Sequence, residues 1–291
     1  MSNNQSPESY QIVKATGETE TFSSYKLNRS LNQAGVPKDI KDVVMAMIIS
    51  QLKPLTTTDQ IHDLVYQYLI KYDPVSATRY NLRLAIMQLG PTGFPFERYV
   101  ATVLQHQGYT TEVDKIIRGA CVNHEVDIVA HKGKTHIMIE WKFHNKRGAR
   151  SDVKTALYVW ARYQDILEGW EKSKKDTDKF HEGWLVTNTK VTTDAEQFAK
   201  CRGLKIVSWY RPFHHSLKDM IVSSGLWPIT CLSTLPQESK QKLVAQGTVL
   251  CIDVANMNRH HFPELASDQV KAIQREAELV CKVPNVLTEE D

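Results

Sequence analysis

Hydrophobic residues in the first third of the chain recur mainly at the spacing of helices. The clearest segment is 58–72, where apolar side chains three or four residues apart predict an amphipathic helix. Similar patterns predict helices at 25–34, 40–52 and 75–89, preceded by short strands at 10–15 and 20–22. This front segment is therefore predicted to be a small α+β module in which a β-hairpin accompanies a helical bundle.

The pattern changes after the sequence GPTGFP at 90–95, where glycine and proline mark a domain boundary. The elements predicted beyond it are a helix from Phe96 to just before Gly108, strands at 109–117, 122–131 and 134–143, a helix at 152–170, a strand at 183–188, a helix at 194–201 and a strand at 204–209. A strand–helix–strand series implies at least one parallel pairing. This part is predicted to be an αβββαβ core.

After Pro212 the chain is predicted to be mainly helical, with a short apolar run at 249–254. The expected fold class is thus a multidomain protein that combines α+β and α/β parts. Its expected domains are residues 10–89, 92–212 and 213–291.

Composition and charge are those of a globular protein, and they favour the cytoplasm. Hydrophobic residues make up 42% and charged residues 24%, which excludes wholesale disorder. The net charge of +3 permits a nucleic-acid partner without requiring one. No apolar run approaches the roughly 18 residues that span a membrane, and the start, MSNNQSPESY, does not resemble a signal peptide. The five cysteines lie far apart in sequence, so neither a zinc ribbon nor a disulfide framework is expected.

The strand-like run THIMIEWKF, at 135–143, carries the most informative side chains. Alternation along a strand places Glu140 and Lys142 on one face and Trp141 on the other. Asp127 lies on the preceding predicted strand, in the sequence HEVDIVA. Two carboxylates and a lysine on adjacent strands suit a Mg²⁺ site that activates water against a phosphodiester. The alternative is a Glu–Lys pair on the surface of a sheet, typically worth under about 1 kcal/mol.

The order of these motifs resembles that of the PD-(D/E)XK nuclease superfamily, in its Mrr-like restriction endonuclease branch. The resemblance covers residues 92–209 and is carried by GFPFERYVATVLQHQGY, HEVDIVA, IEWKFHN and LVTNTKVTTDAEQFAKCRGLKIVSW. It implies that Asp127 and Glu140 bind Mg²⁺ (or Mn²⁺) and that Lys142 positions or polarises the attacking water. It also implies that Glu97, on the first helix, completes the metal shell, and that the substrate is double-stranded DNA.

A basic run follows the lysine directly, with Lys146, Arg147 and Arg150. Beside a nuclease site such a run would neutralise DNA phosphates, although basic runs are more often simply solvated. His124, Glu125 and His144 also lie near the predicted site, and Asp165 is a candidate to support it from the long helix. The aromatic residues of that helix, Tyr158, Trp160 and Tyr163, are expected to belong to the core.

The front segment resembles an ATP-cone, the regulatory nucleotide-binding domain found at the start of ribonucleotide reductases. The resemblance covers residues 10–89 and is carried by VKATGETETFSSYKL, LTTTDQIHDLVYQYL and YDPVSATRYNLRLAI. It implies a nucleotide pocket formed by Val13, Lys14, Glu20, Lys26, Thr58 and His62. The lysines would meet phosphates and Glu20 the sugar or base, while Thr58 opens a helix whose amino terminus favours anions. Ala15 stands where the family usually has arginine.

Together these features predict a Mg²⁺-dependent endodeoxyribonuclease with an ATP- or dATP-sensing module. A homo-oligomer, dimer or tetramer, is expected, with nucleotide altering oligomeric state or nuclease access. The alternative is a regulator that binds nucleotide and DNA without cutting, its nuclease site being vestigial. A third possibility, a ribonucleotide reductase accessory protein, lacks the spaced cysteines that radical or zinc chemistry would use.

Overall fold

The computed structural model describes residues 9–90, 94–173 and 179–282, which form two compact units. The first unit contains the described residues up to Ala85, the segment Trp227–Lys242 and those from Leu250 onward. The second contains the described residues of Ile86–Leu226 together with Leu243–Val249. Part of the predicted boundary at 90–95 lies outside the described residues. No helix in the described ranges has the length and apolarity that crossing a bilayer requires.

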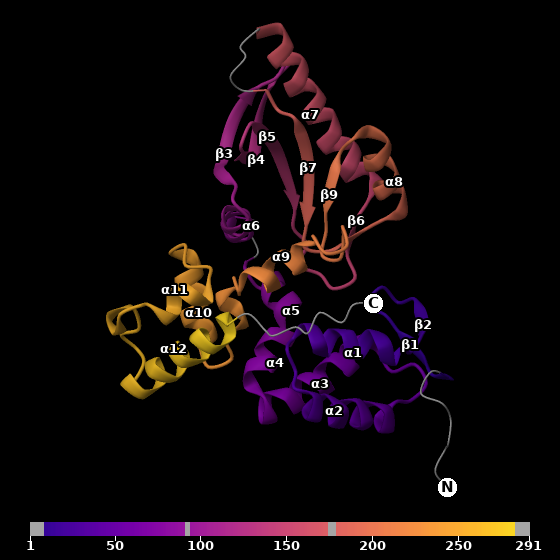
Figure 1. The fold of residues 1–291 in the computed structure, drawn as a ribbon, viewed down its shortest axis with the longest axis vertical. Helices are drawn as coiled ribbons and strands as arrows, with labels where there is room; N and C mark the ends of the chain where they lie inside the picture. Colours follow the sequence, from indigo (N-terminus) through magenta and orange to yellow (C-terminus); the bar gives the residue numbers. More distant parts are fainter. Residues whose placement is uncertain (1–8, 91–93, 174–178, 283–291) are drawn as a thin grey trace. The chain divides into compact units, whose positions relative to one another are not determined.

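The second unit is built on a five-stranded mixed sheet (Figure 1). Its strands, in spatial order, are β3 (Thr110–Arg118), β4 (Asn123–Lys132), β5 (Thr135–Lys142), β7 (Glu182–Thr187) and β9 (Lys205–Val207). The first three pair antiparallel, whereas β5–β7 and β7–β9 are parallel. The predicted parallel pairing is confirmed. It follows from the helices α7 (Val153–Ser173) and α8 (Thr193–Arg202), which connect these strands.

Helices cover both faces of β5. From α7, Tyr163 and Ile166 pack in one cluster with Met138. From α6 (Phe94–His106), the ring of Phe96 lies 5.6 Å from that of Trp141. The sequence pattern predicts an apolar face and a polar face for β5, but the structure buries both, as is usual for a central strand with a parallel neighbour. Glu140 is consequently buried, with 5% of its surface exposed, and the surface Glu–Lys pair is not formed.

Three smaller elements complete the second unit. A short parallel pair, β6 (Arg150–Ser151) and β8 (Lys190–Val191), follows the ends of β5 and β7. Helix α9 (Leu217–Ser224) begins at a capping box formed by Ser216 and Asp219.

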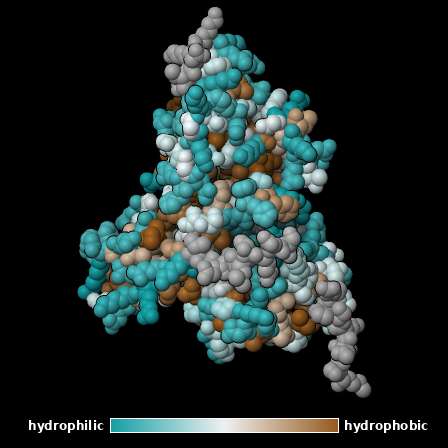
Figure 2. Space-filling model, in the orientation of Figure 1, coloured by the Kyte–Doolittle hydropathy of each residue, from teal (hydrophilic) through white to brown (hydrophobic). Residues whose placement is uncertain are grey.

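Hydrophilic residues cover most of the visible surface (Figure 2). The expectation that Tyr158 is a core residue is wrong, because it lies on the outer side of α7 with 60% of its surface exposed.

The first unit begins with the predicted hairpin, an antiparallel pair of β1 (Gln11–Val13) and β2 (Thr19–Thr21). The helices that follow are α1 (Ser24–Gln33), α2 (Lys38–Gln51), α3 (Thr58–Tyr72), α4 (Pro74–Tyr80) and α5 (Leu82–Met87). Leu31, Val65 and Leu69 are fully buried in their common core. Thr57 and Gln60 form a capping box that starts α3 at the predicted residue.

The single helix predicted at 75–89 is wrong, because α4 and α5 are separate helices that meet at Asn81. Asp73 accepts a hydrogen bond from the amide of Ser76 and caps α4. At the other end the amide of Asn81 donates to the carbonyls of Ala77 and Arg79. Apolar residues continue at helical spacing across this break, so the pattern alone does not reveal it.

The C-terminal part is helical, as predicted, with α10 (Gln237–Ala245), α11 (Cys251–Ala255), α12 (Ser267–Cys281) and short 3-10 helices at Ile229–Cys231 and Arg259–His261. The residues of this part that belong to the first unit form hydrogen bonds with α4. The buried carboxylate of Glu276, on α12, accepts hydrogen bonds from the hydroxyl of Thr78 at 2.9 Å and from the amides of Ser233 and Thr234. Arg79 donates to the carbonyls of Leu279 and Val280, at the end of α12 where helical partners are lacking.

Candidate active site

Three acids predicted for catalysis lie close together just beyond the last paired residues of β4 and β5. The β4–β5 register pairs Ile128 with Ile139, which places Asp127 opposite Glu140. Here a carboxylate oxygen of Asp127 accepts a hydrogen bond from the amide of Trp141 at 3.0 Å, in place of a backbone carbonyl. Glu97 reaches the same region from the first turn of α6 and is 5% exposed. The structure therefore brings Glu97, Asp127 and Glu140 together.

Burial and mutual repulsion raise the pKa of all three carboxyl groups. Burial, then the charges of Asp114 and Asp127, raise the pKa of Glu97 to about 8. Burial and the charge of Asp127 likewise raise the pKa of Glu140 to about 8. For Asp127, burial raises the pKa, and the bond from Trp141 only partly opposes it. Glu97 and Glu140 thus retain protons near neutral pH, and added positive charge would favour their ionised forms.

Asp114, on β3, is a fourth acid that the sequence analysis missed. The β3–β4 register pairs Val113 with Ile128 and Lys115 with Val126, so Asp114 faces Asp127. Its φ of 52° is left-handed, a conformation that aspartate tolerates better than most residues but that interrupts regular strand pairing. Its charge contributes to the raised pKa of Glu97. Asp114 is exposed, so it adds negative charge on the solvent side of the buried Glu97.

Arg162, on α7, partly compensates this negative charge. Its Nη1 atom lies 2.5 Å from Oε2 of Glu140, and its Nη2 atom donates to the carbonyl of Glu125. Both side chains are largely buried, at 13% and 7% exposure. A buried carboxylate requires such a partner, and the charge of Arg162 opposes the rise in the pKa of Glu140. Arg162 is therefore a positioning residue, because it fixes the Glu140 carboxylate in one orientation.

Lys142 lies at the exposed end of β5. Its carbonyl accepts a hydrogen bond from the hydroxyl of Thr187 at 2.7 Å, which ties this strand end to β7. The next residues are held in the same way, since Asn188 accepts from the amide of His144 and donates to its carbonyl. Burial, then the charge of Lys142, lowers the pKa of His144. The basic run at 146–150 therefore starts from a fixed anchor beside the acids.

Asp165, expected to support the site from the long helix, lies on α7 and acts on the loop before β4. Its carboxylate accepts hydrogen bonds from the amides of Cys121 and Val122 and lies 2.7 Å from Nε2 of His124. A side chain at Gly119 would meet Asp165 at 2.0 Å, so the loop must approach α7 closely. Asp165 therefore holds the loop that leads into β4, and it positions Asp127 only through that strand.

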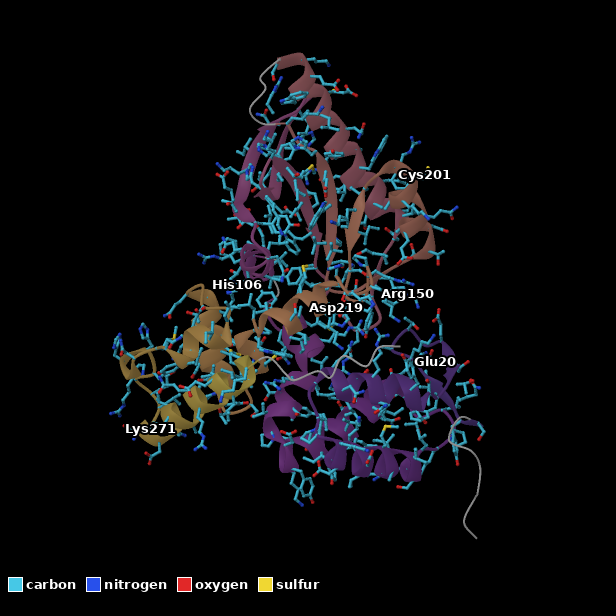
Figure 3. All side chains as sticks on the ribbon, in the orientation of Figure 1. Glu20, His106, Arg150, Cys201, Asp219 and Lys271 are labelled. Atoms are coloured by element: carbon cyan, nitrogen blue, oxygen red, sulfur yellow. The ribbon has the colours of Figure 1, made fainter. Side chains whose placement is uncertain are left out.

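Most residues predicted for the nucleotide pocket also lie together, in the first unit. Glu20, labelled in Figure 3, lies 3.3 Å from the ammonium group of Lys14 and 2.9 Å from that of Lys26. Partial burial opposes ionisation, but the two lysines hold the pKa of Glu20 below its ordinary value. Val13 bridges to Thr57, which places this cluster beside Thr58 at the start of α3. His62 lies one turn further along and stacks on Tyr80 at 5.0 Å.

Models of three protein families match the chain in succession. They are the ATP cone domain at residues 10–83, a restriction endonuclease domain of the Mrr type at 91–211 and the AF1548-like C-terminal domain at 227–281. The resemblance found in the sequence is confirmed: an ATP-cone domain precedes an Mrr-like restriction endonuclease domain.

One similar protein is an uncharacterized protein of Archaeoglobus fulgidus, 32% identical over 173 residues, which are 60% of this chain and 93% of the relative. The chain belongs to the AF1548-like family. A solved structure of this family, titled as the crystal structure of AF1548, a protein of unknown function, is 31% identical with a TM-score of 0.53. The match covers 65% of this chain and 98% of that one.

In this member of the AF1548-like family, Asp127 and Glu140 are suited to one divalent cation. Oε1 of Glu97 and Oε1 of Glu140 are buried and have no hydrogen-bond partner, and unsatisfied anionic oxygens are costly to bury. Within the described ranges no group of three or more His, Cys, Asp or Glu side chains is arranged to hold a metal ion. Mg²⁺ commonly takes only one or two carboxylates and completes its shell with water and substrate phosphate. Asp127 and Glu140 fit that requirement.

The substitution Glu97→Gln should stabilise the metal-free protein at high pH. The pKa of Glu97 is about 8 in the folded state, against an ordinary value of 4.5. The folded protein therefore binds the proton more tightly, and the cost of ionising this group appears as pH rises from about 5 to 9. Glu97→Gln should raise the free energy of unfolding by up to about 5 kcal/mol at the top of this range, since one pKa unit corresponds to about 1.4 kcal/mol, and change it little at the bottom.

Urea unfolding in EDTA at several pH values measures this difference. Glu171→Gln, which changes an exposed acid on α7, provides the control and should show no gain that grows with pH. A Glu97→Gln variant whose stability relative to wild type does not increase with pH would show that Glu97 is not held in a charged, buried cluster.

Proposed function

We propose that the chain is a Mg²⁺-dependent endodeoxyribonuclease whose cleavage responds to ATP or dATP. The observation that carries this proposal is the cluster of three carboxyl groups, Glu97, Asp127 and Glu140, held largely out of water inside a domain of the restriction endonuclease family. A surplus of buried carboxylates destabilises a fold unless a cation offsets it. The family match and the acid pattern together favour a site for phosphodiester hydrolysis.

In this proposal Asp127 and Glu140 hold Mg²⁺ (or Mn²⁺), and Glu97 contacts its water shell from α6. When bound, the ion polarises a phosphoryl oxygen and stabilises the charge that develops during hydrolysis. Arg162 keeps the Glu140 carboxylate aligned, and Asp127 is aligned by the amide of Trp141. Lys142, exposed at the end of β5, orients the attacking water or contacts the scissile phosphate.

The basic run supplies the DNA contacts in this proposal. Lys146, Arg147 and Arg150 follow the anchored His144 and would neutralise phosphates of double-stranded DNA.

Residues 92–212 then form the nuclease domain, and residues 10–89 the nucleotide-binding domain. In the nucleotide-binding domain, Lys14 and Lys26 leave their ion pairs with Glu20 and bind nucleotide phosphates instead. The same site is lined by Val13, Thr58 and His62. Assembly as a dimer or tetramer completes the proposal.

Plasmid cleavage in Mg²⁺ tests the proposed activity. Wild-type protein should nick or cut supercoiled DNA, and EDTA should abolish the reaction. Asp127→Asn and Glu140→Gln should each reduce the rate by roughly 10²–10⁴-fold, because they remove groups that act in the transition state. Lys142→Met should reduce it by about 10²-fold or more.

Glu112→Gln provides a matched control, since Glu112 is an exposed acid on β3 near Asp114, and the variant should cut at the wild-type rate. If wild type binds DNA and Mg²⁺ but never cuts, the alternative of a regulator with a vestigial site replaces this proposal. ATP or dATP should change the wild-type cleavage rate.

Nucleotide binding should depend on the lysines beside Glu20. A lysine that contacts a phosphate contributes about 1–3 kcal/mol, so Lys14→Met or Lys26→Met should weaken ATP or dATP binding roughly five- to more than a hundredfold. Calorimetry on the full chain measures the affinity. Lys71→Met, at the opposite end of α3, should leave it unchanged. Equal affinities in all variants would remove this cluster from the nucleotide site.

A further inference from the structure

Two aromatic rings are exposed in the segment that follows β9. Tyr210 is 41% exposed and Phe213 is 55% exposed. The neighbouring Trp209 is buried, with 2% exposure. Large rings contribute most when they are buried against a partner, so exposed rings in one short segment favour an interaction surface.

Hydrogen bonds fix the backbone that presents these rings. The amide of Ser208 donates to the carbonyl of Arg211 at 2.7 Å, and its hydroxyl accepts from the amide of Arg211 at 3.2 Å. Trp209 is bonded to the carbonyl of Thr189. Phe213 lies inside a turn closed by the amide of His215 and the carbonyl of Pro212. The rings are therefore held outward by the local backbone.

Cations accompany both rings. The ammonium group of Lys190 lies 5.3 Å from the centre of the Tyr210 ring, and the guanidinium group of Arg211 lies 3.9 Å from that of Phe213. Arg150, labelled in Figure 3, pairs with Lys190 in the β6–β8 ladder. We call Arg150, Lys190, Tyr210, Arg211 and Phe213 the aromatic rim. Aromatic rings interleaved with cations match the faces of bases and the phosphates between them.

Nearby acids are engaged in helix caps. The carboxylate of Asp152 accepts from the amide of Thr155, and that of Asp219 accepts from the amide and hydroxyl of Ser216. These two carboxylates anchor the starts of α7 and α9.

The aromatic rim is connected to the candidate active site by a buried chain of hydroxyl groups. Thr187 donates to the carbonyl of Lys142, and the hydroxyl of Ser151 lies 3.3 Å from that of Thr187. Ser151 follows Arg150 directly, and Thr189, also bonded to Thr187, precedes Lys190. The position of the rim relative to Lys142 is therefore fixed.

We propose that the aromatic rim binds unpaired nucleotides of a DNA strand next to the scissile phosphate. Tyr210 and Phe213 stack on bases while Arg150, Lys190 and Arg211 contact phosphates. The favoured substrate class is thus duplex DNA that carries a single-stranded arm, rather than uninterrupted duplex. This inference rests on the proposed nuclease function, which it makes more specific.

Fluorescence anisotropy in EDTA tests the rim without cleavage. Full-length protein is titrated with a duplex and with the same duplex carrying one single-stranded arm. The arm should tighten binding by wild type about tenfold or more, since each stacked base contributes substantially. Tyr210→Leu and Phe213→Leu should each weaken binding of the armed DNA by about 5- to 150-fold, while duplex affinity changes by less than about threefold.

Phe94→Leu is the matched control, because Phe94 is 50% exposed on the same unit and also lies under an arginine, Arg98, at 5.3 Å. It should retain the full preference for the arm. The proposal is overturned if the arm gives no advantage, or if all three variants lose it equally. If wild type prefers the arm through the rim but cuts no DNA in Mg²⁺, the nuclease function fails and the binding assignment stands.

Discussion

The main constraint on the second unit is the group of carboxyl side chains that its fold holds together, with Arg162 as a cationic partner. Glu97, Asp127 and Glu140 come from three different elements, and each has a raised pKa because of burial and of its neighbours. Arg162 offsets part of this charge. Such an arrangement lowers the stability of the metal-free protein. It is understandable as the cost of a site that binds a hard cation.

The surrounding fold serves to hold these groups in place. Helix α6 supplies Glu97 and packs Phe96 on Trp141, whose amide orients Asp127. Helix α7 supplies Arg162 to Glu140 and, through Asp165, fixes the loop that leads into β4. Because helices cover both faces of β5, the Glu140 carboxylate is screened from bulk water, which strengthens every charge interaction in the pocket.

The first unit joins two segments that are distant in sequence. Helix α4 carries Tyr80, which stacks on His62, and also Thr78 and Arg79, which bond to the C-terminal helices. The nucleotide-binding candidates and the AF1548-like C-terminal domain therefore contact the same helix. The hydroxyl of Thr230 also donates to the carbonyl of Ala85, which pins together the two points where the chain leaves and re-enters this unit.

The sequence predicted the elements of both units closely, because apolar periodicity is a local property. It also placed Asp127 and Glu140 on neighbouring strands, as the structure shows, since alternation assigns each strand residue to a face. It did not reveal the burial of both faces of β5, which depends on helices distant in sequence. Asp114 and Arg162 were also missed. Arg162 left a usable signal, because it lies within the apolar stripe of Val159, Tyr163 and Ile166, where a charge requires a partner. Asp114 left no usable signal in the sequence, because only the register of β3 against β4 places it opposite Asp127.

Calorimetric titration of Mg²⁺ into the full chain, in buffers of different ionisation enthalpy, tests the central claim most directly. Because Glu97 and Glu140 hold protons near neutral pH, binding should be saturable and should release protons into the buffer. Asp127→Asn should abolish both the binding heat and its dependence on the buffer. A folded wild-type protein that binds no Mg²⁺, or binds it without releasing protons, would contradict the account of the acidic cluster as a metal site.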